Sequence, residues 1–237
     1  MSNNYFEFKQ FTVTQNHSAM KVGTDGVLLG SWVTIKNART ILDIGTGTGL
    51  LSLMLAQKSS VQIDAIEIDA EACLDAQFNF AQSPWNERLQ LLEIDFLDFS
   101  KLATKQYDLI VSNPPFFKNA LHSSTKKKTL ARHSNCLPHE KLVAEVAKLL
   151  TDDGRFYVIL PSDIVKEFII LSRLQGLHPQ QIVQVFSKTT DTKSVRTMLC
   201  FSKIDCKATE TCFTIYDQSS EYTIEYKTLT KDFYLAF

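Results

Sequence analysis

ILDIGTGTGL, residues 41–50, decides the fold of this chain. The apolar run up to Ile44 is typical of a buried strand, and the apolar positions from Leu50 onward are typical of a helix. Glycines at such a strand-to-helix turn let the backbone approach a ligand closely, because no Cβ intrudes. The spacing GxGxG differs from the GxGxxG of dinucleotide-binding enzymes and from the GxxxxGK[ST] of P-loops. The carboxylate of Asp43 suits a cationic group, such as an ammonium, better than a pyrophosphate.

Strands and helices alternate along the chain after this turn. Such alternation predicts a mostly parallel sheet with helices on both faces. The last two predicted strands have no helix between them and are expected to pair antiparallel. The predicted fold class is α/β and Rossmann-like, with a seven-stranded, mostly parallel sheet and an antiparallel last strand. The predicted strands are 40–44, 62–68, 89–94, 107–112, 155–160, 181–186 and 195–201, and the predicted helices are 50–57, 71–81, 138–150 (ended by Gly154) and 163–174.

Residues 1–39 differ from the alternating part, because they mix polar and aromatic positions and contain the turn-rich run KVGTDG at 21–26. We expect residues 1–39 to form an N-terminal element that covers a cofactor. Residues 40–237 are expected to form the Rossmann-like domain, within one compact domain overall. The aromatic-rich tail, residues 203–237, is expected to pack on the rest.

Acidic residues end the first three predicted strands of the sheet. Glu67 ends the second strand, where a carboxylate can accept hydrogen bonds from a ribose diol. Asp95 ends the third strand, where it could accept from an adenine amine, with Phe96 beside the ring. Together with Asp43 these acids fit a ligand that has an amino-acid end, a ribose and an adenine, which is S-adenosylmethionine. Two alternatives stay open: Asp95 could be a helix cap, and Asp69 could replace Glu67 at the ribose.

The fourth predicted strand ends in Asn113-Pro114-Pro115-Phe116. Consecutive prolines fix the backbone and remove two amide donors. The Asn113 side-chain oxygen and the Pro114 carbonyl can then point at one amine, align its lone pair with an electrophile and stabilise the positive charge that develops on nitrogen. Phe116 offers a face on which a base can stack. The tetrapeptide therefore predicts transfer to a planar NH₂ group.

Composition limits the class of protein. A hydrophobic fraction of 44% and a charged fraction of 22% are ordinary for a globular chain, so wholesale disorder is excluded. The formal net charge is −1, so binding to nucleic acid requires a local patch. Five cysteines without a CxxC pair indicate reduced thiols in a cytoplasmic protein. No signal peptide, membrane span or metal-ligand cluster is recognised, so neither a membrane nor a metal is expected as a partner.

A basic segment directly follows the tetrapeptide. Between Ser112 and Lys141 the chain has six basic residues and one acid, a net charge of +5. A cationic loop beside a target pocket suits the phosphate backbone of RNA. A solvated charge run is the alternative, since exposed lysines are common. The residues expected to contact RNA are Lys118, Lys126, Lys127, Lys128 and Arg132.

Taken in order, the glycine loop, Glu67, Asp95 and the tetrapeptide resemble the motifs of class I S-adenosylmethionine-dependent methyltransferases that act on exocyclic or amide nitrogens. Further stretches resemble the bacterial valine-tRNA (adenine-N(6))-methyltransferase family, and the resemblance covers essentially the whole chain. They are FKQF at 8–11, AMKVGTDGVLLG at 19–30, LLSLMLAQ at 50–57, QSPW at 82–85 and FYL at 233–235.

This resemblance implies methylation of the 6-amino group of the adenosine immediately 3′ of the anticodon in a valine tRNA. It implies that the target adenine is held by Asn113, Pro114 and Phe116, although relatives often have Tyr in place of Phe116. S-adenosylmethionine is the implied cofactor, and the chain is expected to act as a monomer. The residues implied to bind the cofactor are Thr24, Asp25, Asp43, Gly45, Gly47, Glu67, Asp95 and Phe96.

Other functions remain possible for the same motifs. Methylation of a protein glutamine amide uses the same tetrapeptide, because the target is again an NH₂ group. Methylation of a guanine amine in ribosomal RNA is a related alternative. A non-catalytic binding module with this fold would be expected to lose the tetrapeptide or the glycine loop, and this chain keeps both.

Overall fold

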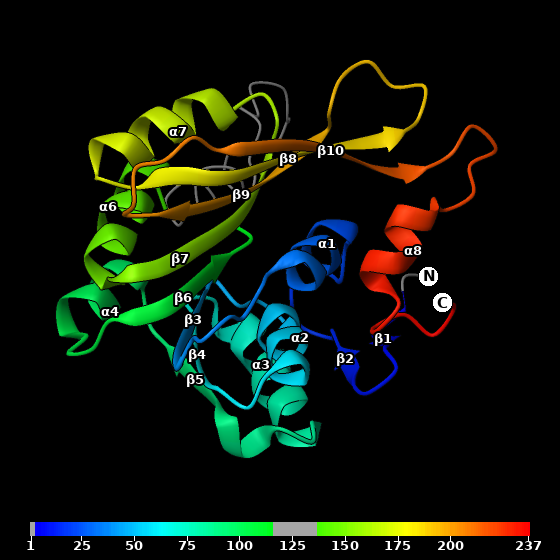
Figure 1. The fold of residues 1–237 in the computed structure, drawn as a ribbon. Coiled ribbons are helices and arrows are strands. Elements are labelled where there is room, and N and C mark those ends of the chain that lie inside the picture. Colours follow the sequence, from blue (N-terminus) through cyan, green and yellow to red (C-terminus); the bar gives the residue numbers. More distant parts are fainter. Residues whose placement is uncertain (1–2, 116–136) are drawn as a thin grey trace, which may run out of the picture.

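A mixed β-sheet forms the centre of the computed structural model, which describes residues 3–115 and 137–237 (Figure 1). Its eight strands are β3 Thr40–Ile44, β4 Gln62–Glu67, β5 Leu89–Glu93, β6 Tyr107–Ser112, β7 Leu150–Pro161, β8 His178–Lys188, β9 Arg196–Ser202 and β10 Thr209–Tyr216. Across the sheet they lie in the order β10-β8-β9-β7-β6-β3-β4-β5. A separate pair, β1 (Tyr5–Glu7) and β2 (Thr12–Thr14), is antiparallel.

All seven predicted strands are present, and the expected direction of the last one is confirmed. β9 pairs antiparallel with both β7 and β8, whereas the pairings among β3, β4, β5, β6 and β7 are all parallel. The predicted count of seven is one too low, because β10 adds an eighth strand at the edge, parallel to β8. This strand comes from the aromatic tail, which packs on the rest of the protein as expected.

Helices cover both faces of the sheet (Figure 1). On one face lie α1 (Thr24–Trp32), α2 (Leu50–Lys58) and α3 (Ala70–Gln82), which share one hydrophobic core with the sheet. On the other face lie α4 (Phe96–Leu102), α6 (His139–Leu149) and α7 (Val165–Leu174), which share a second core. The short helix α8 (Ile224–Thr230) packs against β10 and α1.

Burial explains why the central elements form where they do. β3 is buried along Ile41–Ile44, and β4 is buried along Ile63–Ile66, as expected for parallel strands covered on both faces. Every residue of α2 from Leu50 to Ala56 is buried, so this helix is covered on all sides and is not amphipathic. The turn between β3 and α2 is therefore held on both sides by core elements.

The two ends of the chain lie side by side (Figure 1). Phe8 bridges to Tyr234, and the Lys9 amide donates to the Phe233 carbonyl at 2.8 Å. The rings of Phe8 and Tyr234 are stacked with centroids 6.0 Å apart. The tail therefore fixes the segment that leads into β2.

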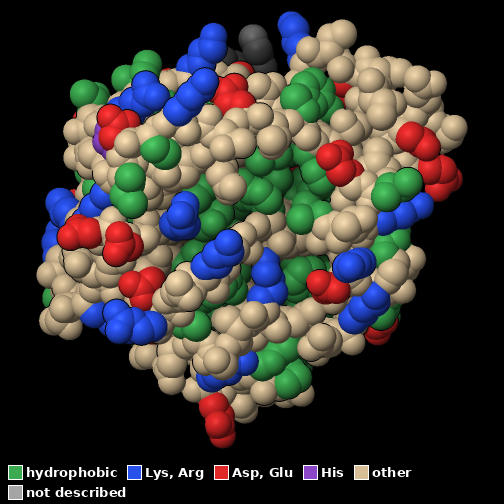
Figure 2. All heavy atoms as spheres, viewed as in Figure 1, with side chains coloured by type: hydrophobic (Ala, Val, Ile, Leu, Met, Phe, Trp, Pro, Cys, Tyr) green, Lys and Arg blue, Asp and Glu red, His purple; other side chains and the backbone are tan. Residues whose placement is uncertain are grey.

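Charged side chains of both signs are interspersed on the face shown in Figure 2, while hydrophobic side chains gather in its central hollow. That distribution agrees with the net charge of −1. Within residues 3–115 and 137–237, no helix has the length and apolar character needed to cross a bilayer.

Candidate active site

The sheet order brings the sequence motifs together at one edge. Ile44 of β3 pairs with Ser112 of β6 on one side and with Ile66 of β4 on the other. The Ser112 hydroxyl also donates to the Ile44 carbonyl at 2.9 Å. The residues that follow these strands, Gly45 and Asn113, therefore start side by side. This edge holds the carboxyl ends of parallel strands, where open α/β sheets bind ligands.

The glycine loop needs its glycines for two different reasons. Gly45, Gly47 and Gly49 have φ of 70°, 57° and 85°, in the left-handed region that favours glycine. A Cβ on Gly45 or Gly47 would have no described atom within 4 Å, so both residues border open space. A Cβ on Gly49 would lie 2.5 Å from Cε1 of Phe80. The first two glycines thus leave room for a ligand, and the third allows α3 to pack.

Gly49→Ala is expected to lower the free energy of unfolding by about 2–4 kcal/mol, because it adds both backbone strain and a clash with Phe80. Gly176 provides a matched control, since its φ is 74° but a Cβ there would meet nothing within 4 Å. Gly176→Ala should therefore cost only the backbone strain. Urea unfolding of both variants measures the difference, and equal losses would show that the Phe80 contact is unimportant.

Asp43 is a buried carboxylate that is only half satisfied. It is 0% exposed, and its Oδ2 accepts from the hydroxyls of Thr46 at 2.6 Å and Ser52 at 2.7 Å. Its Oδ1 has no hydrogen-bond partner among the described residues. Burial raises the pKa of Asp43 to about 6, against the lowering effect of the two hydroxyls. A cation beside this carboxylate would offset the cost of its burial, so the site suits a positively charged group.

The raised pKa predicts a pH-dependent cost in stability. The pKa of Asp43 is about 6 in the folded protein, above the ordinary aspartate value of 3.8. The stability that this carboxyl contributes is therefore fully present below pH 3.8 and is lost as the pH rises through 6. Asp43→Asn removes this titration. The stability advantage of the variant over the unsubstituted protein, measured by urea unfolding without ligand, should be larger at pH 7.5 than at pH 4 by about 2–3 kcal/mol. An advantage that does not change with pH would contradict the raised pKa.

Glu67 holds the glycine loop in place. Its Oε2 accepts from the Gly47 amide at 2.9 Å, and its Oε1 accepts from the amides of Ile68 and Asp69. Asp69 instead caps α3 by accepting from the Glu71 amide at 3.1 Å. Of the two acids that the sequence left open, Glu67 is therefore the one directed at the glycine loop.

Asp95 takes the helix-cap role that the sequence left open for it, and Phe96 lies largely in a hydrophobic core. Asp95 caps α4, because its Oδ1 accepts from the amides of Leu97 at 2.8 Å and Asp98 at 3.3 Å. Phe96 is 6% exposed and belongs to the core that α4, α6 and α7 share with the sheet. Most of its ring therefore contacts protein atoms.

Asn113 carries the second orphaned oxygen of this edge. Its Oδ1 is buried and has no hydrogen-bond partner among the described residues. Its Nδ2 lies against α1, since a Cβ on Gly26 would come within 3.8 Å of that atom. An unpaired buried acceptor costs stability unless a ligand supplies the donor. Phe116, Lys118, Lys126, Lys127, Lys128 and Arg132 lie outside the described residues.

Thr24 and Asp25 begin α1, although the sequence predicted only a turn-rich run there. Asp25 accepts from the guanidinium Nε of Arg196 at 2.7 Å, which connects α1 to β9. Gly26, in the same turn, packs against Leu50 at the start of α2. The first turn of α1 therefore lies between the glycine loop and Asn113.

A family model for the methyltransferase small domain matches residues 14–187. The chain belongs to this family. A tRNA1(Val) (adenine(37)-N6)-methyltransferase from Phocaeicola vulgatus is 43% identical over 236 residues, which are 99% of each protein. Another of the same name, from Trichodesmium erythraeum, is 42% identical over 240 residues, which are 100% of each. The resemblance that the motifs indicated is thus confirmed.

The fold of this methyltransferase is confirmed by solved structures. A structure from Agrobacterium tumefaciens, described as a predicted O-methyltransferase, has a TM-score of 0.69 with 16% identity, covering 88% of this chain and 96% of that chain. At such low identity the likeness concerns the fold alone. It agrees with a class I methyltransferase sheet that has helices on both faces.

The methyl donor of this methyltransferase is S-adenosylmethionine, as the sequence predicted. The described residues fit it: Asp43 presents an unpaired buried oxygen, which suits the ammonium of the amino-acid end. Gly45 and Gly47 border open space at the same place. Glu67 lies beside them, through its hydrogen bond to the Gly47 amide. Within the described part of the chain, no cluster of metal-ligating side chains accompanies this set.

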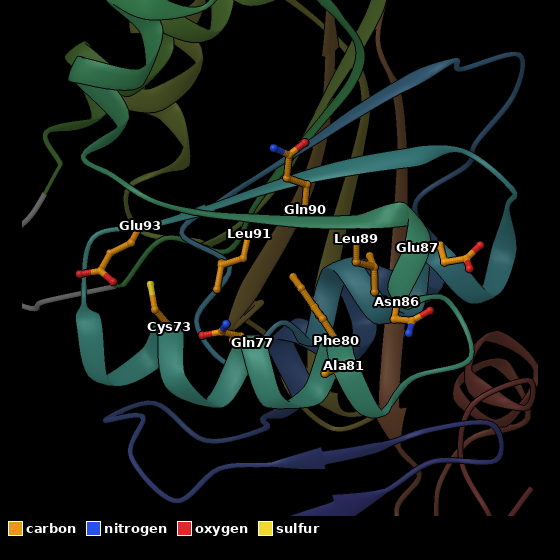
Figure 3. A pocket seen from close by; sticks show the side chains of 10 residues that line it. All are labelled: Cys73, Gln77, Phe80, Ala81, Asn86, Glu87, Leu89, Gln90, Leu91 and Glu93. Atoms are coloured by element: carbon orange, nitrogen blue, oxygen red, sulfur yellow. The ribbon is translucent and has the colours of Figure 1, made fainter.

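A separate groove of about 580 Å³ lies between α3 and β5 in the methyltransferase (Figure 3). Cys73, Gln77 and Phe80 point from α3 toward Leu91 of β5. None of the predicted site residues lines this groove. Burial and the nearby carboxylates of Glu67 and others raise the pKa of Cys73 to about 12. The thiol therefore stays protonated and is a poor nucleophile.

Proposed function

We propose that this methyltransferase transfers a methyl group from S-adenosylmethionine to the 6-amino group of an adenosine in tRNA. The observation that carries the proposal is the unpaired Asn113 Oδ1 directly beside the glycine loop. Relatives that are 40–43% identical over their full length are named tRNA1(Val) (adenine(37)-N6)-methyltransferases, which supports tRNA as the substrate. By the same likeness, the target is the adenosine immediately 3′ of the anticodon of a valine tRNA.

The residues after β6 can activate an aromatic amine. The Asn113 Oδ1 and the Pro114 carbonyl accept hydrogen bonds from the two N–H groups of the target, which fixes the direction of the nitrogen lone pair. Both acceptors also stabilise the positive charge that develops as the nitrogen bonds to carbon. When bound, S-adenosylmethionine supplies a methyl group on a positively charged sulfur. The target amine is neutral before attack, so its proton can leave to solvent afterwards without a base in the site.

The cofactor-binding residues are proposed as follows. Asp43 neutralises the ammonium, and Gly45 and Gly47 allow the methionine part to approach the backbone. Glu67 accepts from the ribose, and Asp95 with Phe96 borders the adenine. Residues 1–39 act as the element that covers the cofactor, with Thr24 and Asp25 beside it, while residues 40–237 form the catalytic domain.

The RNA-binding residues are proposed from the sequence. Phe116 stacks on the target base, and the basic residues that follow it contact phosphates, so binding should weaken strongly with salt. They are Lys118, Lys126, Lys127, Lys128 and Arg132. The cofactor loop and Asn113 come from one chain, so we propose that the protein acts as a monomer. We also propose that it acts on tRNA in the cytoplasm.

A comparison of acceptors tests this function. Purified protein is incubated with S-adenosylmethionine that carries a tritiated methyl group, together with total tRNA, ribosomal RNA or a protein fraction from a strain that lacks this gene. The proposal predicts label in tRNA that is recovered as N(6)-methyladenosine after digestion to nucleosides. Label in ribosomal guanosine or in protein glutamine would instead establish one of the two alternative substrates. Cofactor binding without transfer to any fraction would support a non-catalytic module.

A further inference from the structure

A buried carboxylate on α3 holds the segment that follows β2. Asp75 is 2% exposed and accepts four hydrogen bonds from three consecutive residues. The donors are the amides of Asn16 at 3.2 Å, His17 at 3.0 Å and Ser18 at 2.8 Å, and the Ser18 hydroxyl at 2.7 Å. A buried charge is costly unless such donors surround it, so this carboxylate is placed to bind that backbone.

Asn79 continues the contact one helical turn later, on the same face of α3. It is 1% exposed, accepts from the Thr14 amide at 2.8 Å and donates to the Thr14 carbonyl at 2.8 Å. Its Nδ2 also donates to the Thr48 carbonyl in the glycine loop at 2.8 Å. One side chain thus connects the N-terminal segment directly to the loop that binds the cofactor.

The held segment leads straight to the rest of the site. After Ser18 the chain continues to Gly23, the N-cap of α1, and α1 is connected to β9 by Asp25 and Arg196. Gly26 then lies beside Asn113. Residues 14–26 therefore run from the glycine loop to the tetrapeptide, and they are fixed at both ends.

We propose that Asp75 and Asn79 are positioning residues for S-adenosylmethionine, which hold residues 14–18 against the glycine loop so that the N-terminal segment is a preformed wall of the cofactor site. Neither residue needs to touch the cofactor. The wall is fixed before binding, so the cofactor does not have to order it. This inference rests on the cofactor site alone and is independent of which amine receives the methyl group.

The charge state of Asp75 agrees with a permanent contact. Burial tends to raise its pKa, but the hydrogen bonds from Ser18, His17 and Asn16 outweigh that effect and hold the pKa below its usual value. The carboxylate therefore stays ionised at neutral pH and keeps all its donors.

Asp75→Asn and Asn79→Ala test the proposal, with Ser18→Ala as a mild variant that removes only the hydroxyl donor. Asp64→Asn is the matched control, because Asp64 is also buried (5% exposed) and hydrogen-bonded, but to Tyr107 at 2.6 Å. The readouts are the dissociation constant of S-adenosylhomocysteine by calorimetry, the melting temperature, and hydrogen exchange of the amides of residues 14–18 without ligand.

Asp75→Asn and Asn79→Ala are expected to weaken S-adenosylhomocysteine binding about tenfold or more, with faster exchange at residues 14–18. Ser18→Ala should have a smaller effect in the same direction, and Asp64→Asn should lower the melting temperature without affecting binding. The proposal is overturned if binding is unchanged in the α3 variants, or if Asp64→Asn weakens it equally. Because no RNA is present, a wrong assignment of the RNA substrate would leave this result intact.

Discussion

Asn113→Ala is expected to lower kcat for methyl transfer to tRNA by about 10²–10³-fold, the range seen when one preorganised polar contact to a developing charge is removed. The buried Oδ1 of Asn113 has no partner among the described residues, and we propose that it accepts its hydrogen bond from the substrate amine. The substitution should change kcat, because the charge on nitrogen that Asn113 stabilises develops only in the transition state. Single-turnover kinetics with bound cofactor measures the step directly.

Two comparisons make this result specific. The dissociation constant of S-adenosylhomocysteine should not change in Asn113→Ala, since the Asp43 side of the site is untouched. Asn86→Ala, an exposed asparagine on the short 3₁₀ helix η1 (Asn86–Arg88), should keep full activity. If Asn113→Ala retained kcat, or lost activity only through weaker cofactor binding, the catalytic role of Asn113 would be wrong.

Asp43→Asn is expected to weaken S-adenosylmethionine binding by about 10²-fold. Removing one charge of a buried pair leaves the other uncompensated, at about 3 kcal/mol or more. The amide keeps the shape of the side chain, and its hydrogen bonds with Thr46 and Ser52 can be retained in part. Binding should therefore fall while the unliganded variant becomes more stable at neutral pH.

Two measurements on the same samples check these opposite effects. Calorimetric titration with S-adenosylmethionine measures the weaker binding, and thermal unfolding measures the higher stability of the unliganded variant. Asp64→Asn again serves as the control and should bind the cofactor normally. A variant of Asp43 that lost stability and affinity together would indicate that the carboxylate is a structural element of the loop, and would contradict its role toward a cation.

The site residues that the sequence predicts are those that lie close to the end of a predicted strand. Each motif follows its own strand directly, as Gly45 follows β3 and Asn113 follows β6, so a correct strand prediction also places the motif. The order β6-β3-β4-β5 then brings the motifs to one edge. The hydrogen bonds of Glu67 to the loop could not be predicted, because spacing alone does not separate it from Asp69.

Long-range contacts account for most of what the sequence did not predict. Arg196 meets Asp25 across 171 positions, and Asp75 meets Ser18 across 57. On an amphipathic helix such as α3, polar residues are usually exposed, so Asp75 and Asn79 gave no signal of burial. The packing of residues 14–18 on α3 explains why Asp75 and Asn79 are buried.

The predicted stop at Gly154 is wrong for a related reason. Helix α6 ends at Leu149, and Gly154 lies inside β7. The pairing of β6 with β7 shifts register between Tyr107, opposite Leu150, and Leu109, opposite Arg155. Gly154 therefore belongs to an irregular stretch of strand, where a Cβ would come within 2.8 Å of the Leu150 side chain. A glycine after a helical pattern is typical of a helix end, but glycine also occurs at irregular places in strands.

Mapping the methylated nucleotide is the most direct test of adenosine methylation in valine tRNA by this protein. Unmodified valine tRNA is incubated with the purified protein and S-adenosylmethionine, digested with a base-specific nuclease, and the anticodon-loop fragment is sequenced by mass spectrometry. We predict one added methyl group on the amine of the adenosine immediately 3′ of the anticodon, and none with Asn113→Ala. A methyl group on another nucleotide, or an unmodified tRNA beside a protein that binds the cofactor, would contradict it.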